Sequence, residues 1–412
     1  MKRILALVLS VALLFSFSAC GKKESKKGTD KSANTEAQID LTKTFMPDRT
    51  FTDAKGVEKL DDLANTYYNL TVNKKLNVVY IGGSVTNGTG GKDGYCWRSD
   101  VTDWFKAKFP SATITDTNAG IGSSSSYYGY YRLDEYVLAK NPDLVFVEFA
   151  VNDYYNNMTE TQSATYIEGI IRKIRSHNAN TDVVIVLVGE KSHLTSDSVY
   201  INTHKKVADF YGIPSINVFE ALKATVNSGK SWESLVTDIV HPNNEGYKIY
   251  ANAIEKVLEE KLITSPKKAS ALKGHSVPKD YFVTNPITGG KIIYAEEIDK
   301  AGISGHTVVD NLQYGETLVP MLHQKALKAV AGSIYEFTFE GIGVGLLAKA
   351  ADGPAANVTI TLDGEEVEYI TPQRSSFTHE FLTFDNLTPK EHTVKIEVTK
   401  GTLAIGGILI AE

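Results

Sequence analysis

Between Lys75 and about Leu262, short apolar runs alternate with longer stretches in which apolar residues recur at helical spacing. This alternation is typical of βαβ units, in which helices bury both faces of a parallel sheet. The predicted strands are Leu76–Ile81, Leu144–Phe149, Val183–Val188 and Ile213–Asn217. The predicted helices are Tyr95–Lys108, Ser126–Ala139, Thr161–His177, Ser196–Tyr211 and Asn244–Leu262. The loops that follow the strands meet at one sheet edge, where open α/β sheets bind their ligands.

The pattern changes after Leu262, where short segments alternate apolar and polar residues. Such alternation predicts half-buried antiparallel strands. The predicted strands are Ser333–Phe339, Asn357–Leu362, Glu366–Ile370 and His392–Val398. Asp363 and Gly364 separate two of them and form a typical hairpin turn. We therefore predict a jelly-roll-like β-sandwich over residues 275–412, joined to the first domain by a short hinge at Ser265–Lys268.

The first residues up to Arg3 are basic, an apolar run covers Ile4–Phe17, and Cys20 follows soon after. This order is typical of a signal peptide, and the run is too short to cross a bilayer core of about 30 Å as a helix. The segment before Cys20 resembles the bacterial lipobox, whose cysteine is acylated. We expect a signal peptide over 1–19, a lipid on Cys20 and a disordered tether over 20–40, which together anchor an extracytoplasmic protein to the cell membrane. An ordinary signal peptide with an incidental cysteine is the alternative.

Composition narrows the possible partners. The formal net charge of −6 does not suit a protein that holds nucleic acid. Cys96 is the only other cysteine, so a lipidated Cys20 leaves no intramolecular disulfide, and Cys96 is expected to be a small buried residue. The sequence has no His-Glu-x-x-His motif and no paired cysteines, and we therefore predict neither a metal site nor a cofactor.

Ser84 stands in a glycine-flanked turn, Gly82-Gly83-Ser84, directly after the first predicted strand. Such a turn exposes the hydroxyl and directs the serine N–H into the site, as a nucleophile requires. A phosphate-binding loop is disfavoured, because the run ends in Gly88-Thr89 without the required lysine. The G-x-S-x-G elbow is also excluded, since Thr86 occupies the place of the second glycine.

Asp238 and His241 lie just before the last predicted helix, three residues apart. This spacing lets the carboxylate face the Nδ1 side of the imidazole and leaves Nε2 free to take a proton from a serine. Two more loops offer donors for a developing oxyanion: the Gly120 N–H in the segment Asn118–Ser123, and the Asn152 side chain after the predicted strand Leu144–Phe149.

The ordered blocks Gly-Gly-Ser84, Asn-Ala-Gly120, Val-Asn152-Asp and Asp238-x-x-His241-Pro resemble the SGNH (GDSL-like) hydrolase superfamily. The resemblance covers roughly residues 75 to 262 and implies a flavodoxin-like three-layer α/β fold. With an N-terminal extension, which includes a predicted short helix over Val57–Tyr67, this hydrolase domain is expected to span 41–264.

The resemblance also implies a Ser-His-Asp mechanism, in which Ser84 is the nucleophile, His241 the base and Asp238 the group that orients the base. The implied oxyanion hole consists of the Ser84 N–H, the Gly120 N–H and the Asn152 side chain. The first block reads Gly-Gly-Ser-Val-Thr instead of Gly-Asp-Ser-Leu. That variant is similar to carbohydrate-esterase branches of the superfamily.

Aromatic residues follow the loops of the predicted site. We predict that Tyr127, Tyr154 and Trp97 contact a sugar, and core packing is the alternative for each of them.

The leading functional hypothesis is an extracellular serine esterase that removes O-acetyl groups from polysaccharides, through an acetyl-Ser84 intermediate. Hydrolysis of lipid or aryl esters is the alternative within the enzymes, although no long apolar segment suggests a lipid-binding cap. A solute-binding or carbohydrate-binding lipoprotein is the alternative from another class. We expect the β-sandwich to dock beside the active-site edge, where it either binds sugar or acts as a spacer.

Overall fold

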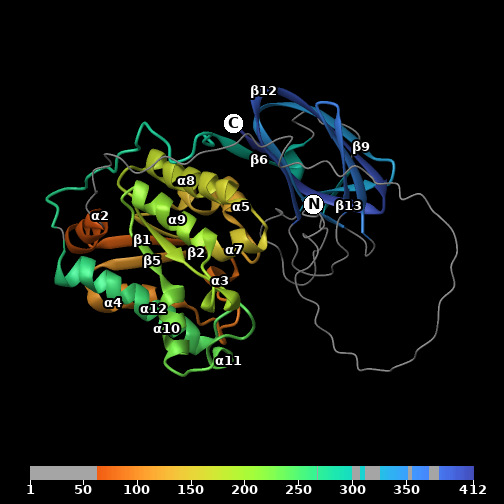
Figure 1. The fold of residues 1–412 in the computed structure, drawn as a ribbon. Helices are drawn as coiled ribbons and strands as arrows, with labels where there is room; N and C mark the ends of the chain where they lie inside the picture. The colour runs from red at the N-terminus through yellow and green to blue at the C-terminus, as the bar shows by residue number, and fades with distance from the viewer. Residues whose placement is uncertain (1–62, 267, 299–306, 311–324, 351–354, 371–379) are drawn as a thin grey trace, which may run out of the picture.

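A computed structural model describes residues 63–412 except 267, 299–306, 311–324, 351–354 and 371–379. The predicted signal peptide, Cys20 and the tether lie outside the described residues, as does the predicted helix Val57–Tyr67 up to residue 62. The described chain forms an α/β domain followed by a β domain (Figure 1), and the main part of each domain has a hydrophobic core of its own.

The α/β domain is built on a five-stranded sheet whose strand pairs are all parallel. The strands are β1 (Lys75–Gly82), β2 (Thr113–Gly120), β3 (Leu144–Glu148), β4 (Asp182–Leu187) and β5 (Ser215–Asn217). Their order, β2-β1-β3-β4-β5, is the flavodoxin-like order 2-1-3-4-5. Strands β3 and β4 are buried at every position, as their continuous apolar runs predict. The predicted α/β class is therefore confirmed.

Helices cover both faces of this sheet and complete the three layers (Figure 1). One face carries α4 (Trp97–Lys108), α10 (Val218–Asn227) and α12 (Asn244–Glu259), and the other carries α5 (Ser126–Tyr131), α8 (Glu160–His177) and α9 (Val199–Phe210). The shorter elements are α2 (Ala64–Tyr68), η2 (Asn69–Asn73), α3 (Ser84–Asn87), α6 (Leu133–Tyr136), η3 (Leu138–Lys140), α7 (Ala150–Tyr155), η4 (Lys191–Leu194), α11 (Trp232–Leu235) and η5 (Glu260–Thr264).

The predicted helix Ser126–Ala139 is divided into α5, α6 and η3. The chain leaves helical geometry at Arg132, where ψ is 1°. The Arg132 guanidinium is buried and donates to the carbonyl oxygens of Ala119 at 2.6 Å and Gly82 at 3.0 Å. Arg132, which stands at this break, therefore anchors the segment to the ends of β1 and β2.

The β domain is an antiparallel eight-stranded sheet with the order β11-β10-β12-β9-β13-β8-β7 and with β6 paired to β13. Its elements are β6 (Gly290–Tyr294), η6 (Ala295–Glu297), β7 (Thr307–Asp310), β8 (Lys325–Val330), β9 (Ile334–Ala350), β10 (Asn357–Leu362), β11 (Glu365–Ile370), β12 (Glu380–Lys400) and β13 (Thr402–Ala411). The register of β12 shifts between Asp385 and Lys390, and such a shift bends a strand. The sheet thereby curves around its own apolar core. The predicted antiparallel β domain is confirmed.

The predicted hairpin turn is also present. Asp363 and Gly364 join β10 to β11 with φ values of 50° and 90°. Both values are positive, as a tight two-residue hairpin turn requires, and glycine tolerates such values best.

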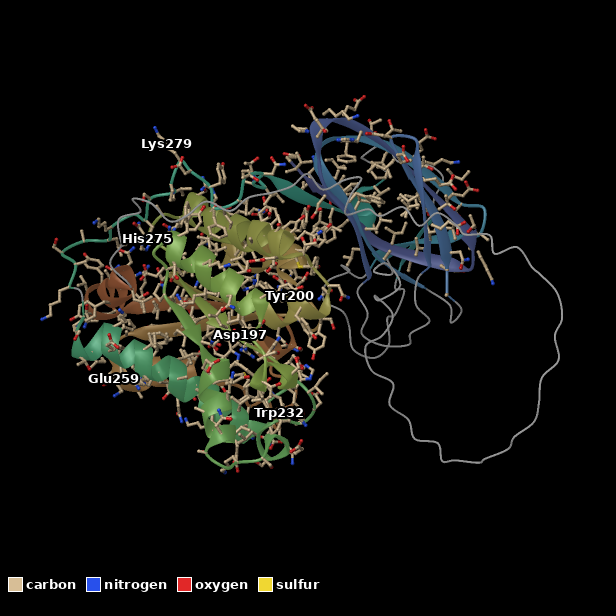
Figure 2. All side chains as sticks on the ribbon, viewed as in Figure 1. Asp197, Tyr200, Trp232, Glu259, His275 and Lys279 are labelled. Atoms are coloured by element: carbon tan, nitrogen blue, oxygen red, sulfur yellow. The ribbon has the colours of Figure 1, made fainter. Side chains whose placement is uncertain are left out.

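Residues 268–289, called the strap below, run along the outside of the α/β domain toward β6. His275 and Lys279 mark their path in Figure 2. The His275 N–H donates to the Ala179 oxygen at 2.7 Å, and Arg172 Nη2 donates to the Pro278 oxygen at 2.8 Å. The first strand of the β domain thus begins at Gly290 and not near residue 275. The predicted short hinge at Ser265–Lys268 stays a prediction, and the chain that follows it is packed against the first domain.

The far half of the strap is part of the α/β core. Phe282, Val283 and Ile287 are buried in it. The buried Glu168 carboxylate of α8 accepts hydrogen bonds from the N–H groups of Phe282 at 2.6 Å and Val283 at 3.0 Å. Truncation directly after Leu262 would therefore leave a buried carboxylate without these donors.

The β domain contacts α5, α6 and α8. Tyr294 Oη donates to Glu135 at 3.0 Å, and Gln162 Nε2 donates to Asp385 Oδ2 at 3.0 Å. Gln162 stands in the first turn of α8, at the sheet edge where the strands end. Three residues of the β domain extend the α/β core, namely Leu347, Leu409 and Ala411. The interface therefore reaches the active-site edge at Gln162.

Candidate active site

Ser84, His241 and Asp238 form a continuous hydrogen-bonded series. Ser84 is the first residue of α3, directly after β1, and its Oγ lies 2.8 Å from His241 Nε2. His241 Nδ1 lies 2.6 Å from Asp238 Oδ2. The 238–241 loop is closed by the Thr237 N–H, which donates to the His241 oxygen at 2.8 Å. The three side chains thus have the connectivity needed to move a proton from the serine to the imidazole.

The low pKa of the Asp238 carboxyl fixes the tautomer of the His241 imidazole. Partial burial would raise the pKa of Asp238, but hydrogen bonds from the His241 ring and from the backbone N–H groups of His241 and Val240 outweigh it and lower this pKa to about 2. The two N–H groups donate to Oδ1 at 2.8 and 2.7 Å. An ionised Asp238 accepts the Nδ1 proton, which leaves Nε2 as the acceptor that faces Ser84.

The two glycines before Ser84 are required by close packing. A Cβ at Gly82 would lie 2.2 Å from Thr86 Oγ1, and a Cβ at Gly83 would lie 1.9 Å from Asn152 Oδ1. Neither position could carry a side chain unless its neighbour moved. The Gly-Gly-Ser sequence therefore lets α3 sit directly on β1 and lets the Asn152 amide approach the backbone next to Ser84.

The Gly120 N–H, which the sequence predicts as an oxyanion donor, donates to Asn118 Oδ1 at 2.9 Å in this structure. A Cβ at Gly120 would lie 2.5 Å from the Asn87 nitrogen, which shows that this glycine is needed for the packing of α3 on β2. Its part in the oxyanion hole stays a prediction.

The loop after Gly120 has two further N–H groups that can donate hydrogen bonds to an oxyanion. Those of Gly122 and Ser123 have no hydrogen-bond acceptor within the described part of the chain. An added Cβ on Gly122 would lie 4.0 Å from Ser84 Cβ, and Ser123 adopts a left-handed φ of 62°. This loop faces the nucleophile and presents successive N–H groups, an arrangement that suits an anion.

The structure brings Asn152 to this site. Its side chain is 5% exposed and lies against Gly83, and its Oδ1 has no hydrogen-bond partner in the described structure. Asn156 Nδ2 donates both to the Asn152 oxygen at 2.8 Å and to the Ser123 oxygen at 3.0 Å. The Asn152 helix and the Ser123 loop are thus tied together beside Ser84.

Sequence reasoning missed Glu148, a buried acid beneath the nucleophile. Burial raises its pKa to about 8, although hydrogen bonds from Thr86 and Gly83 oppose the rise. Glu148 Oε2 accepts from Thr86 Oγ1 at 2.8 Å, and Arg98 Nε donates to the Thr86 oxygen from the other side. The short helix α3 is therefore held from two sides. The signal was a single acid inside the otherwise apolar run Leu144–Phe149.

Two of the three aromatic predictions are wrong. Trp97 is 1% exposed and packs edge-on against Tyr80 with ring centroids 5.3 Å apart. Tyr127 is 5% exposed and packs against Tyr166 with centroids 4.9 Å apart. Both rings belong to the core, because Trp97 packs against the sheet and Tyr127 packs against α8.

Tyr154 is the aromatic residue that can meet a substrate. Its side chain is 39% exposed, and its ring packs edge-on against His193 with centroids 5.4 Å apart. The neighbouring η4 loop contacts the catalytic loop, because the Lys191 N–H donates to the Ile239 oxygen at 2.9 Å. Ile239 and Val199 are also exposed. An apolar wall thus lies next to the triad, and its contact with sugar stays a prediction.

In the part of the chain that the structure describes, no three His, Cys, Asp or Glu side chains are grouped so that they could hold a metal ion. Cys96 is a free, buried thiol. None of the described helices has the length and apolar character that a membrane span needs.

Comparison with known proteins agrees with the fold. Residues 80–249 match the model of the GDSL-like Lipase/Acylhydrolase family, a range that contains Ser84, Asn152, Asp238 and His241. A solved two-domain esterase (CEX) active on acetylated mannans is similar with a TM-score of 0.72 and 21% identity, over 86% of this chain and 96% of that one. Its structure co-crystallized with mannopentaose gives 0.71 and 21%, over 85% and 95%. No curated protein sequence matches the chain.

Residues 80–249 of the α/β domain are therefore similar to the GDSL-like Lipase/Acylhydrolase family. At 21% identity the structural similarity shows the fold, and it extends over both domains. The described part of the chain thus has the same two-domain fold as that esterase.

Proposed function

We propose that this protein is a serine carboxylic-ester hydrolase that removes O-acetyl groups from a polysaccharide. The observation that carries the proposal is the hydrogen-bonded series from Ser84 through His241 to Asp238, with distances of 2.8 and 2.6 Å. The series stands beside backbone and amide donors that have no other acceptor among the described residues.

The chemistry follows from these contacts. Ser84 Oγ attacks the ester carbonyl carbon while His241 Nε2 takes the hydroxyl proton, and the carbonyl oxygen becomes an oxyanion. The Ser84 N–H, the Gly122–Ser123 loop and the Asn152 amide stabilise that charge. When the intermediate collapses, the C–O bond to the sugar breaks and His241 returns its proton to the leaving alcohol. Water then hydrolyses the acyl-Ser84 ester by the same steps.

Two observations support a carbohydrate acetyl ester as substrate. The structurally similar esterase is active on acetylated mannans and was crystallised with mannopentaose. In this chain the exposed Tyr154 ring stands near the triad and is suited to stack on a sugar ring. Lipid and aryl esters are the alternative substrates, and no observation in the described structure favours them over acetylated sugars.

The proposed location is outside the bacterial cell, with the protein held to the membrane by a lipid on Cys20. The support is the sequence of the first 20 residues. Polymeric wall or plant polysaccharide would be accessible to a protein tethered in this way.

The test is acetate release by residues 21–412 from acetylated mannan, acetylated xylan and O-acetylated peptidoglycan, measured side by side with Ser84→Ala as control. We expect release from at least one polymer, and none with Ser84→Ala. Activity on long-chain lipid esters with none on any acetylated polymer would contradict the proposal.

A further inference from the structure

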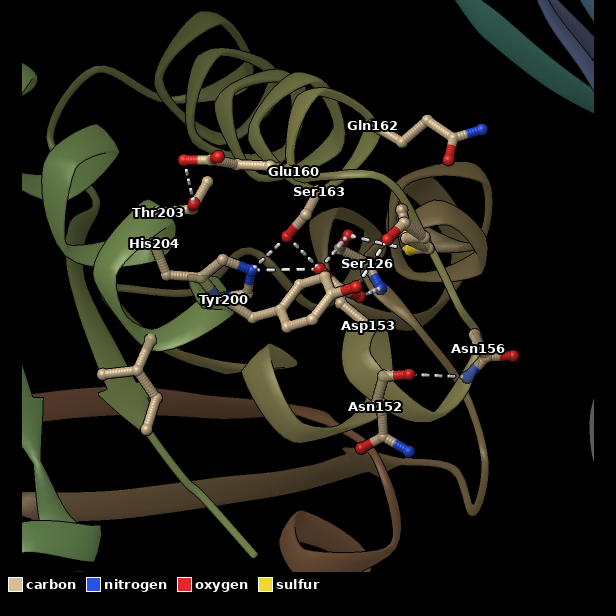
Figure 3. Close-up of polar contacts among 12 residues, drawn as sticks. Ser126, Asn152, Asp153, Asn156, Glu160, Gln162, Ser163, Tyr200, Thr203 and His204 are labelled. Atoms are coloured by element: carbon tan, nitrogen blue, oxygen red, sulfur yellow. Dashed lines mark hydrogen bonds and ion pairs between the residues drawn. The ribbon is translucent and has the colours of Figure 1, made fainter. Parts of the chain in front are cut away.

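A second cluster of Ser, His and Asp side chains lies inside the α/β domain, behind the predicted oxyanion hole (Figure 3). At its centre the Asp153 carboxylate accepts hydrogen bonds from three helices. Ser126 of α5 donates through its N–H and its Oγ, both at 2.8 Å. Ser163 Oγ of α8 donates at 2.6 Å, and His204 Nε2 of α9 lies at 3.0 Å. All four side chains are fully buried.

This cluster is not built as a second triad. A single ring nitrogen, His204 Nε2, faces both Ser163 at 2.9 Å and Asp153 at 3.0 Å, whereas a triad needs one nitrogen for each. His204 Nδ1 is buried and has no hydrogen-bond partner in the described structure. A proton on Nδ1 would therefore lack an acceptor, and the neutral Nε2–H form of the ring fits this place. His204 acts here as a donor to Asp153.

The position of Asp153 in the chain links the cluster to catalysis. It directly follows Asn152 in α7, and Figure 3 shows Asn152 on the opposite side of that helix from the cluster. Helix α7 has only six residues and no side-chain cap at its N-cap, Phe149. Such a short helix does not fix its own orientation. The hydrogen bonds of Asp153 connect it to α5 and to the longer helices α8 and α9 on the same sheet face.

We propose that the Asp153 cluster is a positioning device, in which Ser126, Ser163 and neutral His204 hold Asp153 and thereby keep the Asn152 amide aimed at the developing oxyanion. The inference rests on the proposed esterase function, and it adds residues that never touch the substrate. It predicts that the cluster affects the rate of acyl transfer more than the binding of the ester.

The test compares His204→Leu, which removes the donor, with His204→Gln, whose side-chain N–H can replace Nε2–H. Both are measured with p-nitrophenyl acetate. We expect kcat for His204→Leu to fall by roughly 10- to 100-fold with little change in KM, because a misplacement of about 1 Å in an active site has effects of that size. His204→Gln should recover most of the rate.

The decisive comparison places His204→Leu in the background of Asn152→Ala. If the cluster acts through Asn152, the double variant should be no slower than Asn152→Ala alone. His392→Leu is the matched control, since His392 is also buried and paired with an aspartate, Asp363 at 2.7 Å, but belongs to the β domain. It should leave kcat unchanged. If His204→Leu does not fold, Ser163→Ala removes one donor with little change in volume and enters the same cycle.

The possible outcomes test the positioning role of the Asp153 cluster and the esterase function separately. Full additivity of the His204 and Asn152 effects, or wild-type kcat in a folded His204→Leu, overturns the positioning role and leaves the esterase proposal intact. An Asn152→Ala enzyme with wild-type kcat, or a wild-type protein that cleaves no ester, overturns the proposed site itself.

Discussion

Gly83→Ala tests whether the Asn152 amide takes part in the reaction. The new Cβ would lie 1.9 Å from Asn152 Oδ1, 2.5 Å from its Cγ and 2.8 Å from its Nδ2. All three distances are below 3.0 Å, so the amide has to move. Gly83 itself has a φ of −90°, outside the left-handed region that favours glycine. The change should therefore displace one side chain and leave the nucleophile turn in place.

The expected size of the effect follows from the loss of one oxyanion donor. Removal of such a donor raises the barrier by about 3 kcal/mol, which corresponds to a fall in kcat of roughly 100-fold. KM should change little, because the interaction strengthens only as charge develops on the ester oxygen. Steady-state rates with p-nitrophenyl acetate measure both quantities, and circular dichroism with thermal unfolding checks the fold.

The double variant with Asn152→Ala makes this prediction specific. Once the amide is gone, the new methyl group has nothing to displace, so Gly83→Ala should add no further loss. The reasoning is refuted if folded Gly83→Ala retains more than half of the wild-type kcat, or if the two single effects add in the double variant.

Three further predictions concern buried or paired carboxylates. Asp238→Asn should lower kcat by about 10⁴-fold in rate assays, because an amide no longer fixes the catalytic tautomer of His241. A loss of only about tenfold would contradict this role of Asp238. Burial raises the pKa of Glu148 from 4.5 to about 8, so the folded state holds its proton longer than the unfolded state. Wild-type stability should therefore fall by on the order of 3 kcal/mol relative to Glu148→Gln as the pH rises from about 5 to 8, and urea titrations that show no such slope would contradict this. Glu168→Ala should destabilise the protein by about 3 kcal/mol in urea, because the N–H groups of Phe282 and Val283 in the strap lose their acceptor; an unchanged midpoint would mean that the strap is not fixed there.

The strands of the α/β domain could be predicted because both faces of the parallel sheet are covered. Burial on both sides requires continuous apolar residues, as in Leu144–Phe149, and few other structures give that pattern. The packing of the strap on the α/β domain could not be predicted, because the contact that fixes it is not local in sequence. The sequence around Phe282 and Val283 is compatible with an edge strand, and no local pattern reveals that its N–H groups meet the Glu168 carboxylate, which lies more than a hundred residues earlier in the chain.

In the site, the residues that must react were predictable from type and spacing, whereas those that only pack were not. Gly120 and Gly122 stand two residues apart, and only the hydrogen bond from Gly120 to Asn118 shows which N–H is engaged. Trp97 and Tyr127 follow predicted site loops in sequence, but proximity in sequence does not set the direction of a side chain on a helix. The Asp153 cluster joins three helices, and contacts of that kind follow only from the tertiary fold.

The central claim is that Ser84 is a nucleophile activated by His241. A fluorophosphonate ester, which bonds covalently to activated serines, tests it when residues 21–412 are labelled and the modified peptide is identified by mass spectrometry. The account predicts one adduct, on Ser84, formed rapidly in the wild type and nearly abolished in His241→Ala. An adduct on another serine such as Ser163, or equal labelling of Ser84 with and without His241, would contradict it.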